Sequence, residues 1–292
     1  MKPPLFVYRA PRTLDEAVSA LASDDDAVVL AGGQSLLPAM NFRLAAPSLL
    51  VDIQHVMGLK GIRIEDGLIV VKAMTRHREF ELDEAVRHAN PLIAEVMEHV
   101  AHIPIRNRGT VVGSLCHADA AAEMPMLLML LGGSVVAQSL TGRREILAAD
   151  FFQFHLTTSR RRDEIVVEAR FPVLASDAGW AFDEMTRRHG DFAIVGVGAV
   201  VRLDAAGKAI EVRLAACGIA ACPVRLTDAE NLLVGTTLGA SDLAAAAAAA
   251  AEVVAVPDDM HASSAHRRRV TATLVRRMVA KAAARARERI AR

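Results

Sequence analysis

The chain has 292 residues, of which 52% are hydrophobic and 23% charged, and its 34 basic residues balance its 34 acidic residues. This length favours two packed units over a single domain, and the apolar content is sufficient for a substantial core. A chain without net positive charge has little attraction for a phosphate backbone, so the composition argues against nucleic-acid binding.

The sequence also argues against membrane spans, secretion and metal clusters. The longest apolar run, Met124 to Leu131, is far shorter than the roughly 20 residues that a membrane-spanning helix needs. Arg9 and Arg12 interrupt the apolar N-terminal stretch, which is not the pattern of a signal peptide. The three cysteines form no C-x-x-C pair, and an iron–sulfur cluster usually needs about four thiolates. We therefore expect a cytoplasmic protein that holds no metal.

The N-terminal part of the sequence predicts a small α/β unit followed by a mixed region. Thr13 and Glu16 form a capping-box pattern ahead of an apolar helical face, so a helix is predicted over residues 13–22. Short β-branched runs predict strands at 28–30 and 49–53. Beyond them we expect a hairpin at residues 61–71 and helices at 80–88 and 91–100. A turn-rich loop is expected at 101–119, another helix from 122, and strands at 134–138 and 164–171.

A run of small and polar residues at 175–179 predicts a domain boundary. Beyond it, the residue patterns predict three strands, at 180–185, 193–203 and 209–219. Three helices are predicted after them, at 227–234, 241–254 and 263–290. The alanine run at 244–251 fits an ordered helix, because alanine is the best helix former.

Two loops of small residues are candidate ligand sites. The first, AGGQSLLP, spans Ala31 to Pro38 after a predicted strand. Its glycines allow the backbone to approach a ligand closely, Gln34 and Ser35 add donors, and the gathered N–H groups suit a pyrophosphate. The alternative is an ordinary turn that ends the strand.

The second loop, RNRGTVVGSLCHADAAAEMP, spans Arg106 to Pro125. It combines glycines and hydroxyls with acidic residues at the predicted start of a helix, where negative charge suits the helix dipole. Asp119 and Glu123 are candidates to accept hydrogen bonds from sugar-like hydroxyls. The alternative is that both are first-turn caps.

Together the two loops resemble the paired flavin loops of the FAD-binding medium subunit of the xanthine oxidase and carbon monoxide dehydrogenase (molybdenum hydroxylase) family. A third block, FDEMTRRHGDFAIV at residues 182–195, resembles the R-x-G-D-[FY]-A stretch early in that family's C-terminal domain. The blocks follow the family's order and spacing, and the resemblance runs over nearly the whole chain.

The resemblance implies an α+β fold. Residues 1–175 would form a two-lobed FAD-binding domain of the vanillyl-alcohol-oxidase (PCMH) type, with lobes at about 1–55 and 56–175. Residues 176–292 would form a small C-terminal α+β domain with a three-stranded antiparallel sheet.

The resemblance also implies site residues. The pyrophosphate would be wrapped by Ala31, Gly32, Gly33, Gln34, Ser35 and Leu36, and closed from the other side by Thr110, Gly113 and Ser114. The ribityl and flavin region would be lined by His117, Asp119 and Glu123, with Phe192 near the flavin ring. No catalytic substrate residue is expected on this chain.

The chain departs from the family pattern in three places. Val112 stands where the family usually has glycine before Gly113, and a β-branched residue is costly at positive φ. Ala120 replaces the usual proline, and Asp183 and Glu184 occupy a stretch in which the family has a lysine. We expect FAD binding to survive these changes.

The resemblance implies that this chain is one subunit of a heterotrimer, or of a dimer of heterotrimers. Substrate would be oxidised at a molybdopterin centre on a large subunit, and electrons would cross two-iron two-sulfur clusters on a small subunit to reach FAD here. The cofactor would carry the chemistry, and the protein would position it.

Two alternatives remain open at this stage. One is a free-standing flavin oxidoreductase of the same fold. The other is a docking or regulatory subunit without flavin, suggested by the arginine-rich segment from Arg267 to Arg292. That segment lacks the aromatic residues that would stack on nucleic-acid bases.

Overall fold

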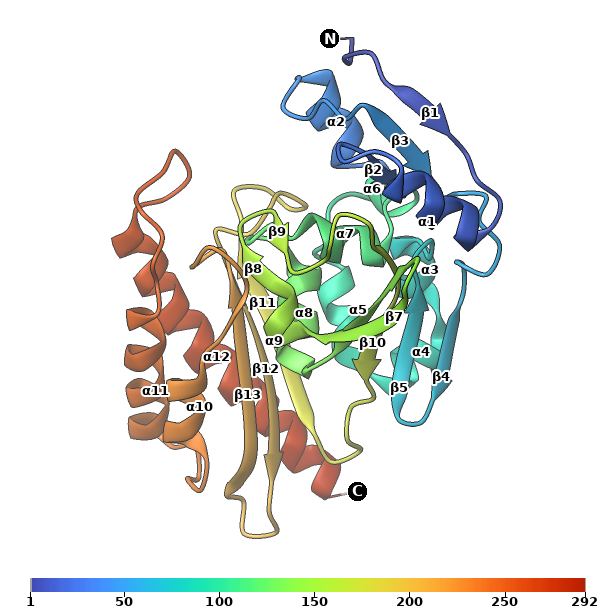
Figure 1. Cartoon of the computed structure of the whole chain (residues 1–292). Helices are drawn as coiled ribbons and strands as arrows, with labels where there is room; N and C mark the ends of the chain where they lie inside the picture. Colours follow the sequence, from blue (N-terminus) through green and yellow to red (C-terminus); the bar gives the residue numbers. More distant parts are fainter. Residues whose placement is uncertain (1, 292) are drawn as a thin grey trace.

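The computed structural model describes residues 2–291. Its first lobe is a three-stranded parallel sheet in the order β1-β3-β2 (Figure 1). The lobe contains β1 (Val7–Arg9), α1 (Leu14–Ala22), β2 (Val28–Leu30), α2 (Leu36–Asn41) and β3 (Leu49–Asp52). The predicted capping box of α1 is present, with Thr13 accepting from the Glu16 amide. The predicted helix and both strands are confirmed, whereas α2 was not predicted.

The second lobe is a five-stranded antiparallel sheet in the order β4-β5-β10-β6-β7. Its strands are β4 (Ile62–Glu65), β5 (Leu68–Lys72), β6 (Ser134–Ser139), β7 (Gly142–Leu147) and β10 (Ile165–Pro172). The helices of this lobe are α3 (His77–Leu82), α4 (Glu84–Ala89), α5 (Pro91–Met97), α6 (Ile103–Arg106), α7 (Val111–His117), α8 (Glu123–Leu131) and α9 (Ala148–Phe151). The predicted hairpin forms β4 and β5, and β10 joins it from a distant part of the sequence.

Two predictions for this lobe were wrong. The single helix expected at 80–88 is two helices, α3 and α4, because Asp83 is extended (φ −68°, ψ 114°) and its carboxylate accepts from the Val86 amide at 2.9 Å. The stretch 101–119, expected to be a loop, contains α6 and α7. Helix α7 begins there because the Thr110 side chain accepts from the Gly113 amide at 3.1 Å.

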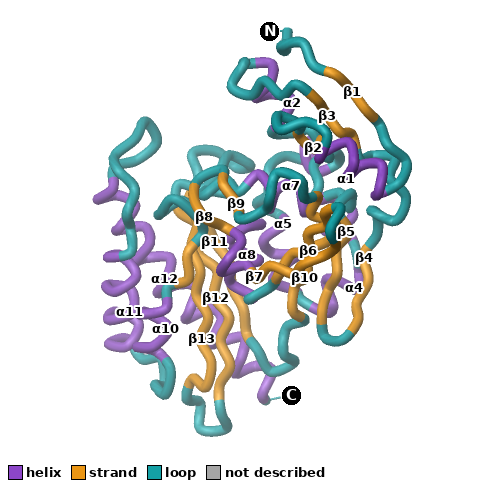
Figure 2. The backbone as a smooth tube through the Cα atoms, viewed as in Figure 1, coloured by secondary structure: helices purple, strands orange, loops and turns teal. Residues whose placement is uncertain are grey.

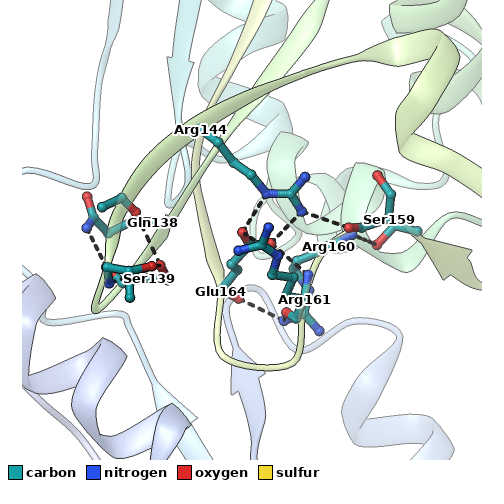
Figure 3. A network of polar contacts seen from close by, with 10 residues as sticks. Gln138, Ser139, Arg144, Ser159, Arg160, Arg161 and Glu164 are labelled. Atoms are coloured by element: carbon teal, nitrogen blue, oxygen red, sulfur yellow. Dashed lines mark hydrogen bonds and ion pairs between the residues drawn. The ribbon is translucent and has the colours of Figure 1, made fainter.

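A short hairpin, β8 (Phe152–Phe154) and β9 (Thr157–Thr158), lies beside the end of α7, where the Leu156 amide donates to the Ala118 carbonyl at 3.0 Å. The segment after it is fixed by the polar network in Figure 3. Arg144 of β7 donates to both carboxylate oxygens of Glu164, at 2.6 and 2.8 Å, and to the Ser159 carbonyl at 2.8 Å. The network therefore ties the turn that precedes β10 to the edge strand of the sheet.

The C-terminal part contains the three long antiparallel strands that were predicted, β11 (Gly179–Met185), β12 (Val195–Leu203) and β13 (Ala209–Cys217). A two-residue strand, β14 (Val224–Arg225), adds to the β13 edge, so the sheet has four strands. Three predicted helices follow, α10 (Thr227–Leu233), α11 (Ala240–Glu252) and α12 (Ser264–Ile290), and they cover one face of this sheet (Figures 1 and 2).

Strand β12 explains how the two parts of the chain meet. Its odd-numbered side chains, such as Val197, share a core with α12, whereas Gly198 faces α8. A Cβ on Gly198 would lie 2.6 Å from Leu130 of α8, so α8 packs directly against the strand. Every residue of α8 is buried, as expected for a helix that is apolar on all sides. Helix α8 therefore packs between the second lobe and the C-terminal sheet.

None of the helices in the described part of the chain has the length and apolarity required to cross a bilayer.

Candidate functional site

The first candidate loop leaves the C-terminal end of β2, beside the C-terminal end of the parallel strand β3. Ligands of parallel sheets bind at this edge. Gly33 has φ +72°, a left-handed conformation that glycine adopts without strain. The loop then runs directly into α2, which begins at Leu36.

The structure brings the two candidate loops into contact. A Cβ on Gly32 would lie 2.6 Å from the Arg108 carbonyl oxygen and 2.9 Å from the Thr110 nitrogen, so any side chain there would collide with main-chain atoms. A Cβ on Gly113 would lie 3.9 Å from the Ala31 Cβ. Gly32 is therefore required by the approach of the second loop, whereas Gly113 is required by the Thr110 side chain of its own loop, 2.5 Å from the position of a Cβ.

The first loop presents a row of free amides. Within residues 2–291, no hydrogen-bond acceptor lies against the backbone N–H groups of Gly32, Gly33, Gln34, Ser35 and Leu36. Adjacent amides without protein partners are the donors that bind a phosphate or pyrophosphate. We call this row, residues 32–36, the amide cradle.

Val112 does not obstruct the second loop. It is the second residue of α7, is buried, and has no positive φ. The residue in the left-handed region is Ala118, with φ 52°, at the C-terminal cap of the same helix. The valine is tolerated because this stretch is helical, and the geometry expected from the glycine pattern is not needed at this position.

Asp119 and Glu123 have different roles in the structure. The Asp119 carboxylate accepts from the Ala121 amide at 2.9 Å, which closes the turn before α8. Glu123 is the first residue of α8 and only 5% exposed. Burial, with a smaller contribution from the nearby Glu184, raises the pKa of Glu123 to about 8. A carboxyl group that is protonated at neutral pH can donate a hydrogen bond as well as accept one.

The other predicted residues lie in the first loop, on α7 and in the segment before β12. Ser114 and His117 belong to α7, and burial lowers the pKa of His117, which is partly buried. Gln34 turns back, and its amide Nε2 donates to the Gly32 carbonyl at 3.2 Å. Phe192 is 56% exposed.

Two further polar residues near Glu123, Glu184 and His99, were not predicted as site residues from the sequence. Glu184 is buried, and one of its carboxylate oxygens lies 3.3 Å from His99 Nδ1, while the other has no hydrogen-bond partner among the described residues. The hydrogen bond to Glu184 raises the pKa of His99. Both acids lie near the buried thiol of Cys217. The only signal in the sequence was the acidic pair at 183–184 in place of a lysine.

The arrangement suits one kind of ligand. The amide cradle fits a diphosphate, the absence of a Cβ at Gly32 lets the second loop lie against the first, and the buried Glu123 carboxyl can hydrogen-bond hydroxyl groups. A dinucleotide with a polyhydroxyl chain matches this order of groups.

Comparison with known proteins identifies the class. Residues 4–174 match the FAD binding domain in molybdopterin dehydrogenase, and residues 180–282 match the CO dehydrogenase flavoprotein C-terminal domain. The chain therefore belongs to the FAD-binding subunits of the molybdopterin dehydrogenases, a family of molybdenum hydroxylases, and is a flavoprotein component of an oxidoreductase.

Individual relatives match over almost their whole length. The chain is 43% identical to the 6-hydroxypseudooxynicotine dehydrogenase complex subunit alpha of Paenarthrobacter nicotinovorans, over 98% of this chain and 97% of that protein. A chain of quinoline 2-oxidoreductase from Pseudomonas putida 86 superposes with a TM-score of 0.93 at 39% identity, covering 98% of this chain and 99% of the other. A chain of carbon monoxide dehydrogenase from Hydrogenophaga pseudoflava gives a TM-score of 0.95 at 34% identity, covering 98% and 99%. The predicted family, fold and cofactor are confirmed.

Proposed function

We propose that this chain binds FAD between its two loops and relays electrons within a heteromeric molybdenum hydroxylase. Electrons would arrive from iron–sulfur clusters on a small partner subunit, after substrate oxidation at molybdenum on a large partner subunit. They would leave to an external acceptor. The observation that carries the proposal is the contact between the Gly32 and Arg108 segments beside the amide cradle.

The proposed binding residues divide into three groups along the cofactor. The diphosphate would be held by the loop Ala31, Gly32, Gly33, Gln34, Ser35 and Leu36, and the opposite side would be closed by Thr110, Gly113 and Ser114. The ribityl and ring region would be lined by His117, Asp119 and Glu123. FAD supplies the redox chemistry, accepting and releasing electrons singly or in pairs.

The protein's own contribution is to position the cofactor. The amides are held in place by the turn at Gly33 and by packing against the second loop, so their orientation is set before the cofactor binds. Glu123 lies on the buried helix α8, where a carboxyl group retains its proton at neutral pH.

A free-standing flavin enzyme is less well supported than a subunit. The chain spans 97% of a relative that is itself named as a subunit of a complex. We also infer a division into domains near residue 175 and a reducing, cytoplasmic setting, which is supported by three cysteines that are all free.

The test is flavin content. The purified chain is expected to contain about one FAD per chain, measured by absorbance and by chromatography of the released flavin. Gly32→Ala should abolish binding, because the added Cβ would lie 2.6 Å from a main-chain oxygen. Gly239→Ala is the matched control, since its nearest neighbour is the end of the Asp242 side chain at 3.6 Å. A wild-type chain that remains flavin-free after incubation with excess FAD would refute the proposal.

Co-purification tests the partner assignment separately. The chain expressed together with its candidate small and large subunits is expected to elute as one complex that contains flavin, iron, sulfide and molybdenum. Elution of the flavin-loaded chain alone would support the free-standing alternative.

A further inference from the structure

Arg76 connects the segment before α3 to the second loop. Its guanidinium Nη1 donates to the Arg108 carbonyl oxygen, and its main chain forms an isolated antiparallel bridge with Thr110. The bridge is framed by two hydrogen bonds, from the His77 amide to Gly109 at 3.0 Å and from the Val111 amide to Thr75 at 3.1 Å. The position of Arg76 is therefore fixed by both main-chain and side-chain contacts.

The same carbonyl connects Arg76 to the amide cradle. The Arg108 oxygen that accepts from Arg76 is the atom that a Cβ on Gly32 would approach to 2.6 Å. The guanidinium and the first glycine of the cradle therefore meet at a single main-chain oxygen. This places a positive charge near the first residue of the amide cradle.

The Arg76 guanidinium lacks a direct carboxylate partner, although Glu79 and Asp52 lie close enough to favour its charged form. Within the described residues Arg76 forms no ion pair, although it is partly buried, and burial lowers its pKa. The carboxylates of these two acids bond groups other than the guanidinium. Glu79 pairs with Lys60 at 2.8 Å and accepts from the main-chain amide of Arg76 at 2.9 Å, and Asp52 accepts from the Tyr8 hydroxyl at 2.6 Å. Of the five N–H donors of a guanidinium, one is used in the structure.

We propose that Arg76 binds the diphosphate of the cofactor together with the amide cradle. The inference rests on the proposed FAD site and adds a residue to it. A planar guanidinium can donate two parallel hydrogen bonds to phosphate oxygens, and it brings the positive charge that neutral amides lack. Arg76 therefore selects for ligands that carry a diphosphate and makes no contribution to binding of the flavin ring.

The test compares three probes on the flavin-free full-length chain: FAD, ADP and riboflavin. ADP carries the diphosphate without the flavin, and riboflavin carries the ring and ribityl chain without phosphate. Arg76→Gln is expected to raise the Kd of FAD and of ADP by about 10-fold to 100-fold, the range for loss of a charge-assisted hydrogen bond. The Kd of riboflavin should not change.

Arg78→Gln is the matched control. Arg78 lies two residues further along, in α3, but its guanidinium is paired with Glu81 at 3.0 Å. Its replacement should leave all three Kd values unchanged. Arg76→Lys keeps the charge and loses the planar fork, so it should give an intermediate loss for FAD and ADP and none for riboflavin.

The outcomes separate this inference from the proposed function. Equal weakening of FAD and riboflavin by Arg76→Gln would mean that Arg76 only holds the second loop in place, and unchanged binding of FAD and ADP would also overturn the inference. If Arg76→Gln melts below the assay temperature, Arg76→Lys decides: a loss confined to FAD and ADP supports the inference, and an equal loss for riboflavin, or no loss, overturns it. A wild-type chain that binds none of the probes would refute the FAD site itself.

Discussion

Glu123→Gln should remove a pH dependence from the stability of the flavin-free chain. The pKa of Glu123 is raised from 4.5 to about 8 in the folded protein, so the folded state retains a proton that the unfolded state releases. The contribution of Glu123 to the free energy of unfolding is fully present below pH 4.5. It decreases as the pH rises from 4.5 through the folded-state pKa of about 8. At about 1.36 kcal/mol per pKa unit, wild-type loses about 2.5 kcal/mol of unfolding free energy between pH 6 and pH 9.

Glutamine has nearly the shape of the protonated acid and does not ionise, so the variant should lose none of this amount. The assay is urea unfolding of wild-type and variant at both pH values, with the difference between the two proteins as the result. Glu252→Gln, an exposed position on α11, is the matched control and should follow wild-type. A wild-type-minus-variant difference that is the same at pH 6 and pH 9 would show that Glu123 is ionised in the folded chain.

Three further predictions concern the packing of the fold. Gly179→Ala should lower the free energy of unfolding in urea by about 3 kcal/mol, because its Cβ would lie 1.9 Å from the Ala282 carbonyl of α12. The control, Gly239→Ala, should lower it by less than about 1 kcal/mol. Equal losses in the two variants would argue against close packing at Gly179. Arg267→Met should cost about 3 kcal/mol or more, because this buried guanidinium bonds two main-chain carbonyls and a carboxylate; a neutral effect would refute that role. Burial depresses the pKa of His77 from 6.5 to about 4, so wild-type should lose about 3 kcal/mol as pH falls from 6.5 to 4, and His77→Gln should lose less; parallel pH curves would contradict this.

Much of the fold could be predicted because its signals are local. The capping box at Thr13, the alternating strands and the long C-terminal helix each depend on residues within a few positions of one another. The two loops were recognisable for the same reason, since each motif is continuous in the sequence. The helix break at Asp83 was missed, because a cap inside an apolar periodic run is a weaker signal than the periodicity around it.

Contacts between distant segments could not be predicted. Composition does not show that Gly32 touches Arg108, that Arg76 donates to the same carbonyl, or that Val112 lies within a helix and needs no left-handed backbone. Nor does it show that Glu123 is buried deeply enough to keep its proton.

The sequence by itself determined most of the helices and strands, the family and the positions of the two loops. Only the tertiary structure decided which amides remain free, which cation stands beside them, and which carboxyl group is shielded from water. The physical reason is that secondary structure and motifs follow from neighbouring residues, whereas desolvation and hydrogen-bond satisfaction depend on every segment that packs around a group.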